Sequence, residues 1–398
     1  MREFHDILES PATFLSQADW EVRLQEKLRP LPQFHVGEAK YRFALAAAKA
    51  GHWQAARKTM SRFVTGHRRH ALHEAALWWL IRYDRSAEIA TMERSQMPVP
   101  NGVSKATFVS PTPPPTQTNS VLPLPDPPTS DPPTNKWWQP LVDLAPQSSA
   151  DPTVALPAAA RMRHGQPRDA TELWNQVSGS AWLQWSRLAK GEIWLIKSRG
   201  NSPVPVALTR LTTRPHIDGK MDELLWNSTH PVKLQASRFT QVSGNTVARF
   251  AYDREFLYLA IECEKIRNYR YPAMAPRAGR DQADPQLDHF TWQIDVDRDY
   301  STAFNFTVDS RGWVSEGVTG STAWDPTWYV AATETPRQWS AECAISWQAL
   351  GVMPPTSEHP FAIKLTRTIP GQITAHWPAQ SETPWGWLVG VETNTLGD

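Results

Sequence analysis

The chain has 398 residues, with 41 Lys and Arg against 40 Asp and Glu and a formal net charge of +1 at pH 7. This length exceeds one ordinary core, so we expect two or three structural units. The near-neutral charge excludes a global electrostatic attraction to nucleic acid or anionic membrane. Two cysteines, Cys263 and Cys343, exclude a disulfide framework and a four-thiolate zinc site. No membrane-spanning run and no signal peptide is visible, which leaves the compartment open.

Residues 1–96 have the spacing of amphipathic helices. Apolar side chains recur every three or four positions on both sides of Gly51, which interrupts the pattern. We predict an antiparallel helix pair joined by a short turn at Gly51, with a third helix near 71–81. The residues that carry the pair are Tyr41, Ala44, Leu45, Ala48, Trp53, Ala56, Met60 and Phe63.

The same helical region has more basic than acidic side chains. Such a charge can attract nucleic acid or another anion, but it is more often only a solvated helix face, so nucleic acid is not favoured. A protein partner is the other candidate for these helices. The basic residues are Lys49, Arg57, Lys58, Arg62, Arg68, Arg69, Arg82 and Arg85.

Residues 97–157 differ in composition, because they hold 16 of the 35 prolines and many Ser and Thr. A segment of this kind buries too little apolar surface to offset its chain entropy. We predict a disordered, semi-stiff linker. Within it, the pair Trp137-Trp138 is either a small docking point onto a neighbouring domain or a linker aromatic without a role.

A helical pattern returns in residues 158–200, where we predict a second helical hairpin. Gly165 is followed at the same intervals by Ala170, Trp174 and Val177 as Gly51 is by its own apolar residues. A small residue after the turn lets two helices approach closely. Both hairpins are loosely similar to tetratricopeptide-type hairpins, but no regular 34-residue period supports a full solenoid.

Residues 205–398 have a period of two. Short β-branched and aromatic runs alternate with Gly, Pro, Asp and Asn, which predicts an antiparallel β-sandwich of immunoglobulin-like or jelly-roll-like type. The whole chain is therefore predicted to be a multidomain α + β protein. The clearest runs are 256–261, 289–296, 303–308, 339–345 and 361–366.

Residues 215–391 contain an ordered set of motifs. The motifs are Ile217-Asp218-Gly219-Lys220 with Asp222 and Trp226, Tyr252-Asp253 with Leu257-Tyr258-Leu259, Asp288 with Phe290 and Asp295-Val296-Asp297, Phe306 with Val308 and Gly312, Trp324-Asp325 with Trp328, Trp339-Ser340-Ala341-Glu342, Leu350-Gly351 and Trp385-Gly386-Trp387-Leu388. This ordered set resembles the family-nine carbohydrate-binding modules, and the resemblance implies a β-sandwich that recognises a glycan and performs no chemistry.

In the sugar binders of that family, two tryptophans sandwich one ring while carboxylate and amide groups bond its hydroxyls. The equivalent tryptophan positions fall near Pro285 and Ala379, and the acidic one near Thr291. None is the required type, so we predict a relocated site. A pyranose packs its C–H face on an indole and needs polar partners for its hydroxyls. The candidates are Trp377, Trp385 and Trp387 for stacking, with Asp288 or Arg367 for the hydroxyls.

Cofactor predictions are few. Asp295, Asp297 and Asp299 alternate and could converge on calcium, although three carboxylates supply only part of the six to eight oxygens it needs. A solvated hairpin turn is the alternative. Some members of the wider sandwich superfamily hold haem through Met and His, for which this chain offers Met274 and His376.

The sequence contains no catalytic constellation that we can identify. His73-Glu74 begins the HExxH zinc pattern, but Leu77 stands where its second histidine belongs. A nucleophile elbow, a phosphate loop and a dinucleotide fingerprint are absent from the sequence. We therefore predict a non-catalytic carbohydrate-binding protein, with a link to polysaccharide breakdown as one option. The alternatives are a protein-interaction scaffold whose sandwich has lost sugar binding, and a haem-binding sandwich.

Overall fold

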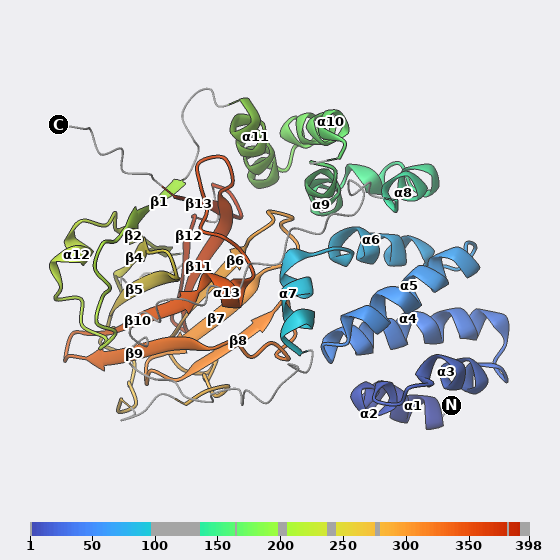
Figure 1. Ribbon diagram of the computed structural model, residues 1–398, viewed down its shortest axis with the longest axis horizontal. Coiled ribbons are helices and arrows are strands. Elements are labelled where there is room, and N and C mark those ends of the chain that lie inside the picture. The colour runs from blue at the N-terminus through green and yellow to red at the C-terminus, as the bar shows by residue number, and fades with distance from the viewer. Residues whose placement is uncertain are drawn as a thin grey trace.

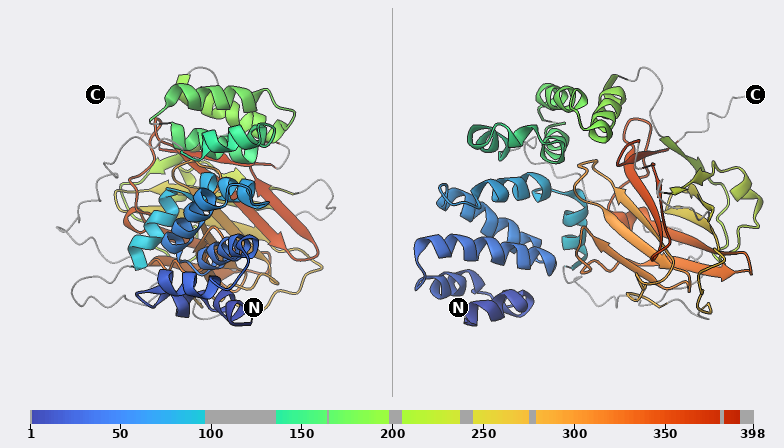
Figure 2. Two further views of the ribbon diagram at one scale, coloured as in Figure 1. Left: turned by 90° about the vertical axis from the view of Figure 1, so that its right-hand side faces the viewer. Right: turned by 180° about the vertical axis from the view of Figure 1, so that it is seen from behind.

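The computed structural model describes residues 2–96, 136–163, 165–197, 205–236, 244–274, 279–379 and 382–390. Helices make up the first half of the chain and a β-sandwich the second, and the two lie side by side (Figures 1 and 2). The predicted multidomain α + β class and the C-terminal β-sandwich are confirmed. Among the described residues, no helix is both long and apolar enough to span a membrane.

The first helical group contains the predicted hairpin. Gly51 has φ 84°, a left-handed conformation that suits glycine, and it turns the chain between α4 and α5. Apolar faces of α4, α5 and α6 pack together around Met60 and Phe63, which are fully buried. The helices of this group are α1 (Arg2–Glu9), α2 (Pro11–Leu15), α3 (Trp20–Leu28), α4 (Gln33–Lys49), α5 (Trp53–Gly66), α6 (His73–Tyr83) and α7 (Ala87–Gln96).

The second helical group starts earlier than predicted. Three of its helices have a proline in the first turn, at Pro140, Pro152 and Pro167, where the missing N–H costs nothing. Pro152 follows Asp151, whose side chain accepts a 2.8 Å hydrogen bond from the Thr153 N–H and caps the helix. The elements are α8 (Trp138–Leu144), the 3-10 helix η1 (Ser148–Ala150), α9 (Pro152–Met162), α10 (Pro167–Ser178) and α11 (Leu183–Lys197).

The predicted linker 97–157 therefore differs from the structure in its last third, where α8, η1 and the start of α9 lie. Its part at 97–135 falls outside the described residues. Of the two interpretations of Trp137, the structure agrees with a docking point. Trp137 is 8% exposed and packs in the helical core, and its indole N–H donates to Asp84 Oδ2 at 2.9 Å.

Two β-sheets form the sandwich, and strand β1 belongs to both. The first half of β1 pairs with β13 and its second half with β4, both in parallel, while the other pairs are antiparallel. We call the sheet that contains β6 sheet A and the sheet that contains β5 sheet B. Sheet A has the order β8-β7-β6-β11-β13-β1, and β12 and β3 extend it beyond β11; sheet B has the order β1-β4-β5-β10-β9, with β2 beside β4.

Burial alternates along β6 and β7, whereas β5 and β10 are buried along almost their whole length. The strands are short. They are β1 (Pro205–Arg210), β2 (Val232–Lys233), β3 (Gln235–Ala236), β4 (Thr246–Tyr252), β5 (Phe256–Glu264), β6 (His289–Asp295), β7 (Phe304–Asp309), β8 (Val314–Val318), β9 (Trp328–Glu334), β10 (Gln338–Ser346), β11 (Phe361–Ile369), β12 (Ile373–Trp377) and β13 (Gly386–Gly390), with the short helices α12 (Leu224–Asn227) and α13 (Trp347–Leu350) between strands.

The space between the sheets is filled with aromatic and aliphatic side chains. Trp292 stacks on Phe306 with ring centroids 4.4 Å apart, and Trp328 and Trp339 are almost fully buried nearby. Both cysteines are free thiols buried in this core. Many of the chain's tryptophans thus fill the core and offer no surface for a ligand.

The outer face of sheet B is covered by the motif Ile217-Asp218-Gly219-Lys220 and the Trp226 that follows it. Ile217 and Trp226 pack with Tyr258 and Ala344 in a second buried cluster. Beneath them lies Glu342 of β10, which is fully buried. Glu342 Oε1 accepts the indole N–H of Trp226 at 2.8 Å, and its Oε2 accepts the backbone N–H groups of Asp218 at 3.1 Å and Gly219 at 2.9 Å.

The backbone conformation at position 219 requires glycine. Its φ is 83°, and a Cβ would stand 2.8 Å from the carbonyl carbon of Ala332 on β9. Only glycine fits this approach without strain. The motif therefore stabilises sheet B through its hydrogen bonds to Glu342.

Candidate functional site

One face of sheet A presents polar side chains to the outside. Alternate residues of β6 and β7 point away from the core because successive side chains of a strand face opposite sides. Gln293 stands opposite Asn305 and Thr291 opposite Thr307. The Gln293 Nε2 donates to Asn305 Oδ1 at 2.5 Å, and the two threonine hydroxyls are 3.1 Å apart. All four side chains are half-buried.

A cavity of about 410 Å³ opens on this face, which we call the polar pocket. Most of the residues that line it carry a hydroxyl or amide side chain. One wall is the loop after β8, which folds back over Gly317 so closely that a Cβ there would lie 2.5 Å from the Ser321 carbonyl oxygen. The pocket is lined by Gln293, Ser301, Thr302, Ala303, Asn305, Thr307, Ser315, Glu316, Gly317, Thr319, Gly320, Ser321, Thr322 and Trp385.

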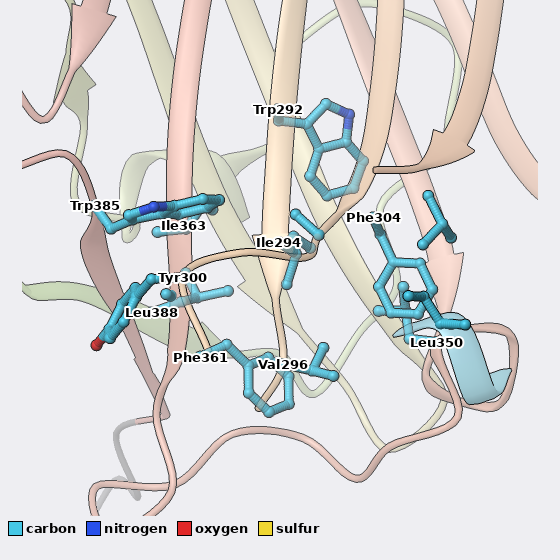
Figure 3. Close-up of a cluster of buried hydrophobic side chains, with 14 of the residues drawn as sticks. Trp292, Ile294, Val296, Tyr300, Phe304, Leu350, Phe361, Ile363, Trp385 and Leu388 are labelled. Atoms are coloured by element: carbon cyan, nitrogen blue, oxygen red, sulfur yellow. The ribbon is translucent and has the colours of Figure 1, made fainter. Parts of the chain in front are cut away.

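Trp385 supplies the aromatic side of the polar pocket. It stands directly before β13 and is 9% exposed, so most of its ring is packed and one part lines the cavity. Figure 3 shows Trp385 and Tyr300 together at one side of the buried cluster, away from Phe304 and Leu350. Of the three tryptophans predicted for ligand contact, Trp385 is the one among the pocket's described lining residues.

The polar pocket presents no free charge among its described lining residues. Glu316 is the one ionisable side chain in that lining, and it is 4% exposed. Its Oε1 accepts from Arg280 Nη2 at 2.5 Å and its Oε2 from the Trp328 indole N–H at 3.1 Å. Burial raises the pKa of Glu316, which Arg280 partly offsets. The pocket is therefore suited to a neutral, hydroxyl-rich ligand more than to an ion.

The other two predicted tryptophans have packing partners. Trp387 is 1% exposed and lies under α11, where a Cβ on Gly191 would collide with its ring. Trp377, at the end of β12, is half-buried and lies against Gly386. Trp387 is too buried for the exposed stacking role predicted for it, whereas a ligand contact by Trp377 stays a prediction.

Asp288 and Arg367 form a buried ion pair inside the sandwich. Arg367 Nε donates to Asp288 Oδ1 at 3.0 Å and Nη2 to Oδ2 at 2.7 Å, and both side chains are at most 1% exposed. The Trp339 indole N–H also donates to Asp288 Oδ2 at 2.8 Å. Thr246 Oγ1 and backbone carbonyls accept the remaining Arg367 N–H groups. We predicted that Asp288 or Arg367 would bond ligand hydroxyls. In the structure both side chains are buried and bonded to groups inside the sandwich.

Two of the three alternating aspartates bond to the helices. Asp297 Oδ2 accepts from Arg161 Nη1 of α9 at 2.7 Å and from the Ala87 N–H of α7 at 3.0 Å, and Asp299 pairs with Arg161 Nη2. Asp295 accepts the N–H groups of Asp299 and Tyr300. A solvated hairpin turn, the alternative to calcium, does not describe this buried junction.

Carboxylate oxygens of Glu88, Asp297 and Asp299 lie within 4.8 Å of one another, which is close enough for a shared cation. The Arg161 guanidinium already contacts two of these groups. Burial raises the pKa of Glu88 and Asp295 well above the usual range, with neighbouring negative charges adding to the effect. Calcium at this place stays a prediction.

A second charged cluster joins α11 to the same loop. Glu192 is 1% exposed, and its Oε1 accepts from Arg298 Nε at 2.9 Å while its Oε2 accepts from Arg163 Nη2 at 3.2 Å. Tyr300 also donates its hydroxyl to Glu192. Although burial opposes it, the two guanidinium groups and these hydrogen bonds lower the pKa of Glu192 to about 2. The helical half and the sandwich are thus joined through buried charges as well as one continuous core.

The residues nominated for haem lie on different elements. Met274 follows β5 and lies near Gly312, which precedes β8. His376 is on β12, where its Nδ1 is 3.2 Å from Thr366 Oγ1, and burial lowers its pKa. The haem hypothesis stays untested by this geometry.

Comparison with known proteins finds similar solved structures, three of which are described here. The chain matches no protein-family model and no curated protein. A family-nine carbohydrate-binding module from Caldicellulosiruptor kristjanssonii in complex with cellotriose is 16% identical, covers 49% of this chain and 98% of its own, and has a TM-score of 0.34. The corresponding glucose complex is 15% identical over 49% of this chain and 100% of its own, with a TM-score of 0.33.

The third structure is a protein from Bacteroides uniformis whose carbohydrate binding is itself an inference. It is 10% identical, covers 47% of this chain and 99% of its own, and has a TM-score of 0.36. These structures include the family that the sequence motifs resemble. At these identities and TM-scores they assign neither ligand nor site residues to this chain.

Of the residues that line the polar pocket, the sequence predicted Trp385 as a ligand contact. The run Ser315-Glu316-Gly317-Val318-Thr319-Gly320-Ser321-Thr322, which supplies one wall, is rich in small polar residues between two buried aromatic segments. That composition is a usable signal for a loop that approaches a ligand closely. The opposing Gln293 and Asn305 carry no such signal, because polar residues on a strand face are ordinary.

Proposed function

We propose that this chain is a non-catalytic carbohydrate-binding protein whose glycan site is the polar pocket. The observation that carries the proposal is a cavity of about 410 Å³ lined by hydroxyl and amide side chains with one indole and no free charge among its described lining residues. The volume is within the range of about 300–1,000 Å³ typical of small-molecule sites. A link to polysaccharide breakdown is part of the same proposal.

The chemistry of the lining matches what a neutral sugar needs. Each hydroxyl of a pyranose donates and accepts, so it is best met by Asn, Gln, Ser and Thr groups, which do both. Gln293 and Asn305 lie side by side, and the hydrogen bond from Gln293 Nε2 to Asn305 Oδ1 orients the two side-chain amides. Trp385 offers the apolar surface on which the C–H face of a ring can pack.

The full chain is the right material for the test, because the helical half and the sandwich share one core. We would titrate it by isothermal calorimetry with glucose, cellotriose, xylotriose and N-acetylglucosamine. Binding at millimolar or lower concentration is expected for at least one sugar. The double variant Gln293→Ala and Asn305→Ala is expected to weaken that binding at least about tenfold, the loss that one or two hydrogen bonds produce.

Thr368→Ala is the matched control. Thr368 is half-buried on β11, it alternates with the core residues Arg367 and Ile369, and it does not line the polar pocket. Its loss should leave sugar affinity unchanged. Wild-type protein that binds none of the four sugars would count against the proposal, as would a double variant that binds as well as wild type.

A second candidate is a scaffold whose sandwich serves structure and protein contact. The burial of Trp387 under α11 and of the Asp288–Arg367 pair favours it, because groups expected at a sugar site are used for packing. Exposed apolar side chains at the start of α11, Trp182 at 64% and Leu183 at 69%, provide a surface for a protein partner. A chain that binds no glycan but retains a protein through Trp182 would establish this alternative.

A further inference from the structure

The loop between β6 and β7 connects the helical half to the polar pocket. Its first part, Asp295 to Asp299, is bonded to α7 and α9. Its last part, Ser301 to Ala303, lines the pocket. A few residues of backbone therefore separate the interdomain contact from the proposed glycan site.

Thr302 takes part both in the contact with the helical half and in the lining of the polar pocket. Its Oγ1 lies 2.8 Å from Glu88 Oε2 of α7, 2.8 Å from the hydroxyl of Ser86 just before that helix, and 2.8 Å from Asp299 Oδ2. Thr302 and Ser86 are 1% exposed and Glu88 is fully buried. Such a closed network of short hydrogen bonds holds a side chain in one rotamer.

Glu88 holds the loop at two points. Its Oε1 accepts the Val296 N–H at 2.7 Å, six residues before Thr302. On the far side of Thr302, the Ala303 N–H donates to Thr319 Oγ1 at 2.9 Å, and Thr319 belongs to the opposite pocket wall. The contacts thus run from α7 through Thr302 and Ala303 to the wall beyond.

We propose that Glu88 is a positioning residue of the polar pocket, so that the helical half completes the binding site of the sandwich. Glu88 and Ser86 fix Thr302, and Thr302 fixes the wall that a ligand would meet. The assignment of the ligand as a glycan rests on the function proposed above. The positioning of the wall by α7 does not depend on it.

The test compares three variants of the full chain by amide hydrogen exchange. Glu88→Ala removes both anchor points. Glu88→Gln keeps an acceptor for Val296 and a donor for Thr302, which is what the protonated acid supplies, because burial and nearby carboxylates raise the pKa of Glu88 well above its usual range. Glu93→Ala is the matched control, since Glu93 is on the same helix but pairs with Arg57 at 2.7 Å, away from the loop.

We expect Glu88→Ala to increase exchange of the Thr302 and Ala303 amides by about tenfold or more, because their local opening becomes easier. Glu88→Gln and Glu93→Ala should leave these amides within about twofold of wild type. Unchanged exchange in Glu88→Ala would overturn the proposal, and so would an equal increase across all of β5 and β10. If Glu88→Ala does not fold, Ser86→Ala, which removes one hydroxyl, replaces it with the same expected local increase.

Binding of cellotriose separates this proposal from the function on which it draws. If wild type binds the sugar, Glu88→Ala should bind about tenfold more weakly and Glu88→Gln equally well. Equal affinity of Glu88→Ala and wild type would overturn the positioning role. If wild type binds no sugar, the glycan assignment fails while the exchange result still decides whether α7 positions the pocket wall.

Discussion

Trp387 of β13 lies directly on Gly191 of α11, with no room between them for a Cβ. This contact brings a helix backbone against the indole of a sandwich strand. Glycine in the middle of a helix costs about 1 kcal/mol relative to alanine, so its presence here needs a packing reason. The close approach of Trp387 is that reason, and it explains why an aromatic expected at a ligand site is buried instead.

Gly191→Ala should therefore destabilise the protein although alanine is the better helix former. Overpacking of a tight contact costs about 1–3 kcal/mol, which exceeds the gain in helix propensity. The measurement is the free energy of unfolding from urea denaturation. Gly179→Ala is the control, because Gly179 ends α10 with φ −90° and a Cβ there meets nothing closer than 3.7 Å. Equal stability of Gly191→Ala and wild type would contradict this account, because it would show that Trp387 can move aside for a Cβ without cost.

The Asp288–Arg367 pair should matter for stability and not for sugar binding. Asp288→Asn leaves a buried guanidinium without its counter-charge, which costs about 3–5 kcal/mol. Arg367→Met likewise leaves the buried Asp288 carboxylate without its counter-charge, at a similar cost in stability. The double variant should be more stable than either single one, because no uncompensated charge remains and Asn still accepts the Trp339 N–H. Additive losses in the double variant would contradict this account.

The sequence predicted the sandwich because its signals are local. Alternation along β6 and β7 and the turn residues between strands depend on neighbours in the chain. The second helical group was placed too late because Pro140 and Pro152 were counted as linker residues, whereas they lie in the first turns of α8 and α9. Proline at that position is compatible with a helix, and only the capping by Asp151 distinguishes the two cases.

The site was harder to predict because its residues depend on contacts between distant segments. Trp377, Trp385 and Trp387 look alike in sequence, and α11 decides that Trp387 is covered. Asp297 and Asp299 alternate as calcium ligands do, yet their partner Arg161 stands more than a hundred residues earlier. Such pairings across the chain cannot be inferred from a local spacing.

Calcium addition distinguishes the cation hypothesis from the ion-pair geometry. With Arg161 bonded to Asp297 and Asp299, we expect millimolar calcium to leave the unfolding temperature of wild type unchanged. Arg161→Ala leaves Glu88, Asp297 and Asp299 without that guanidinium, so this variant should unfold at a lower temperature and calcium should restore part of the loss. Differential scanning calorimetry with calcium or EDTA measures both. Calcium that raises the wild-type temperature would instead establish a native metal site.

Glu342 should make stability depend on pH between about 4.5 and 7. Burial raises the pKa of Glu342 to about 7 from a model-compound value of 4.5. The folded state then holds a proton that the unfolded state has lost, so stability is greatest below pH 4.5 and falls as the pH rises through 7. The expected fall from this one group is about 3 kcal/mol. Urea denaturation at a series of pH values measures it.

Glu342→Gln isolates this contribution from those of other buried acids. The variant cannot titrate at residue 342, so its stability relative to wild type should improve as the pH rises from 4.5 to 7. It also loses one acceptor for Trp226 or the Asp218 and Gly219 amides, which lowers its stability by about 1 kcal/mol at every pH. Parallel pH curves for Glu342→Gln and wild type would mean that Glu342 is ionised in the folded protein throughout this range, held by its three N–H donors.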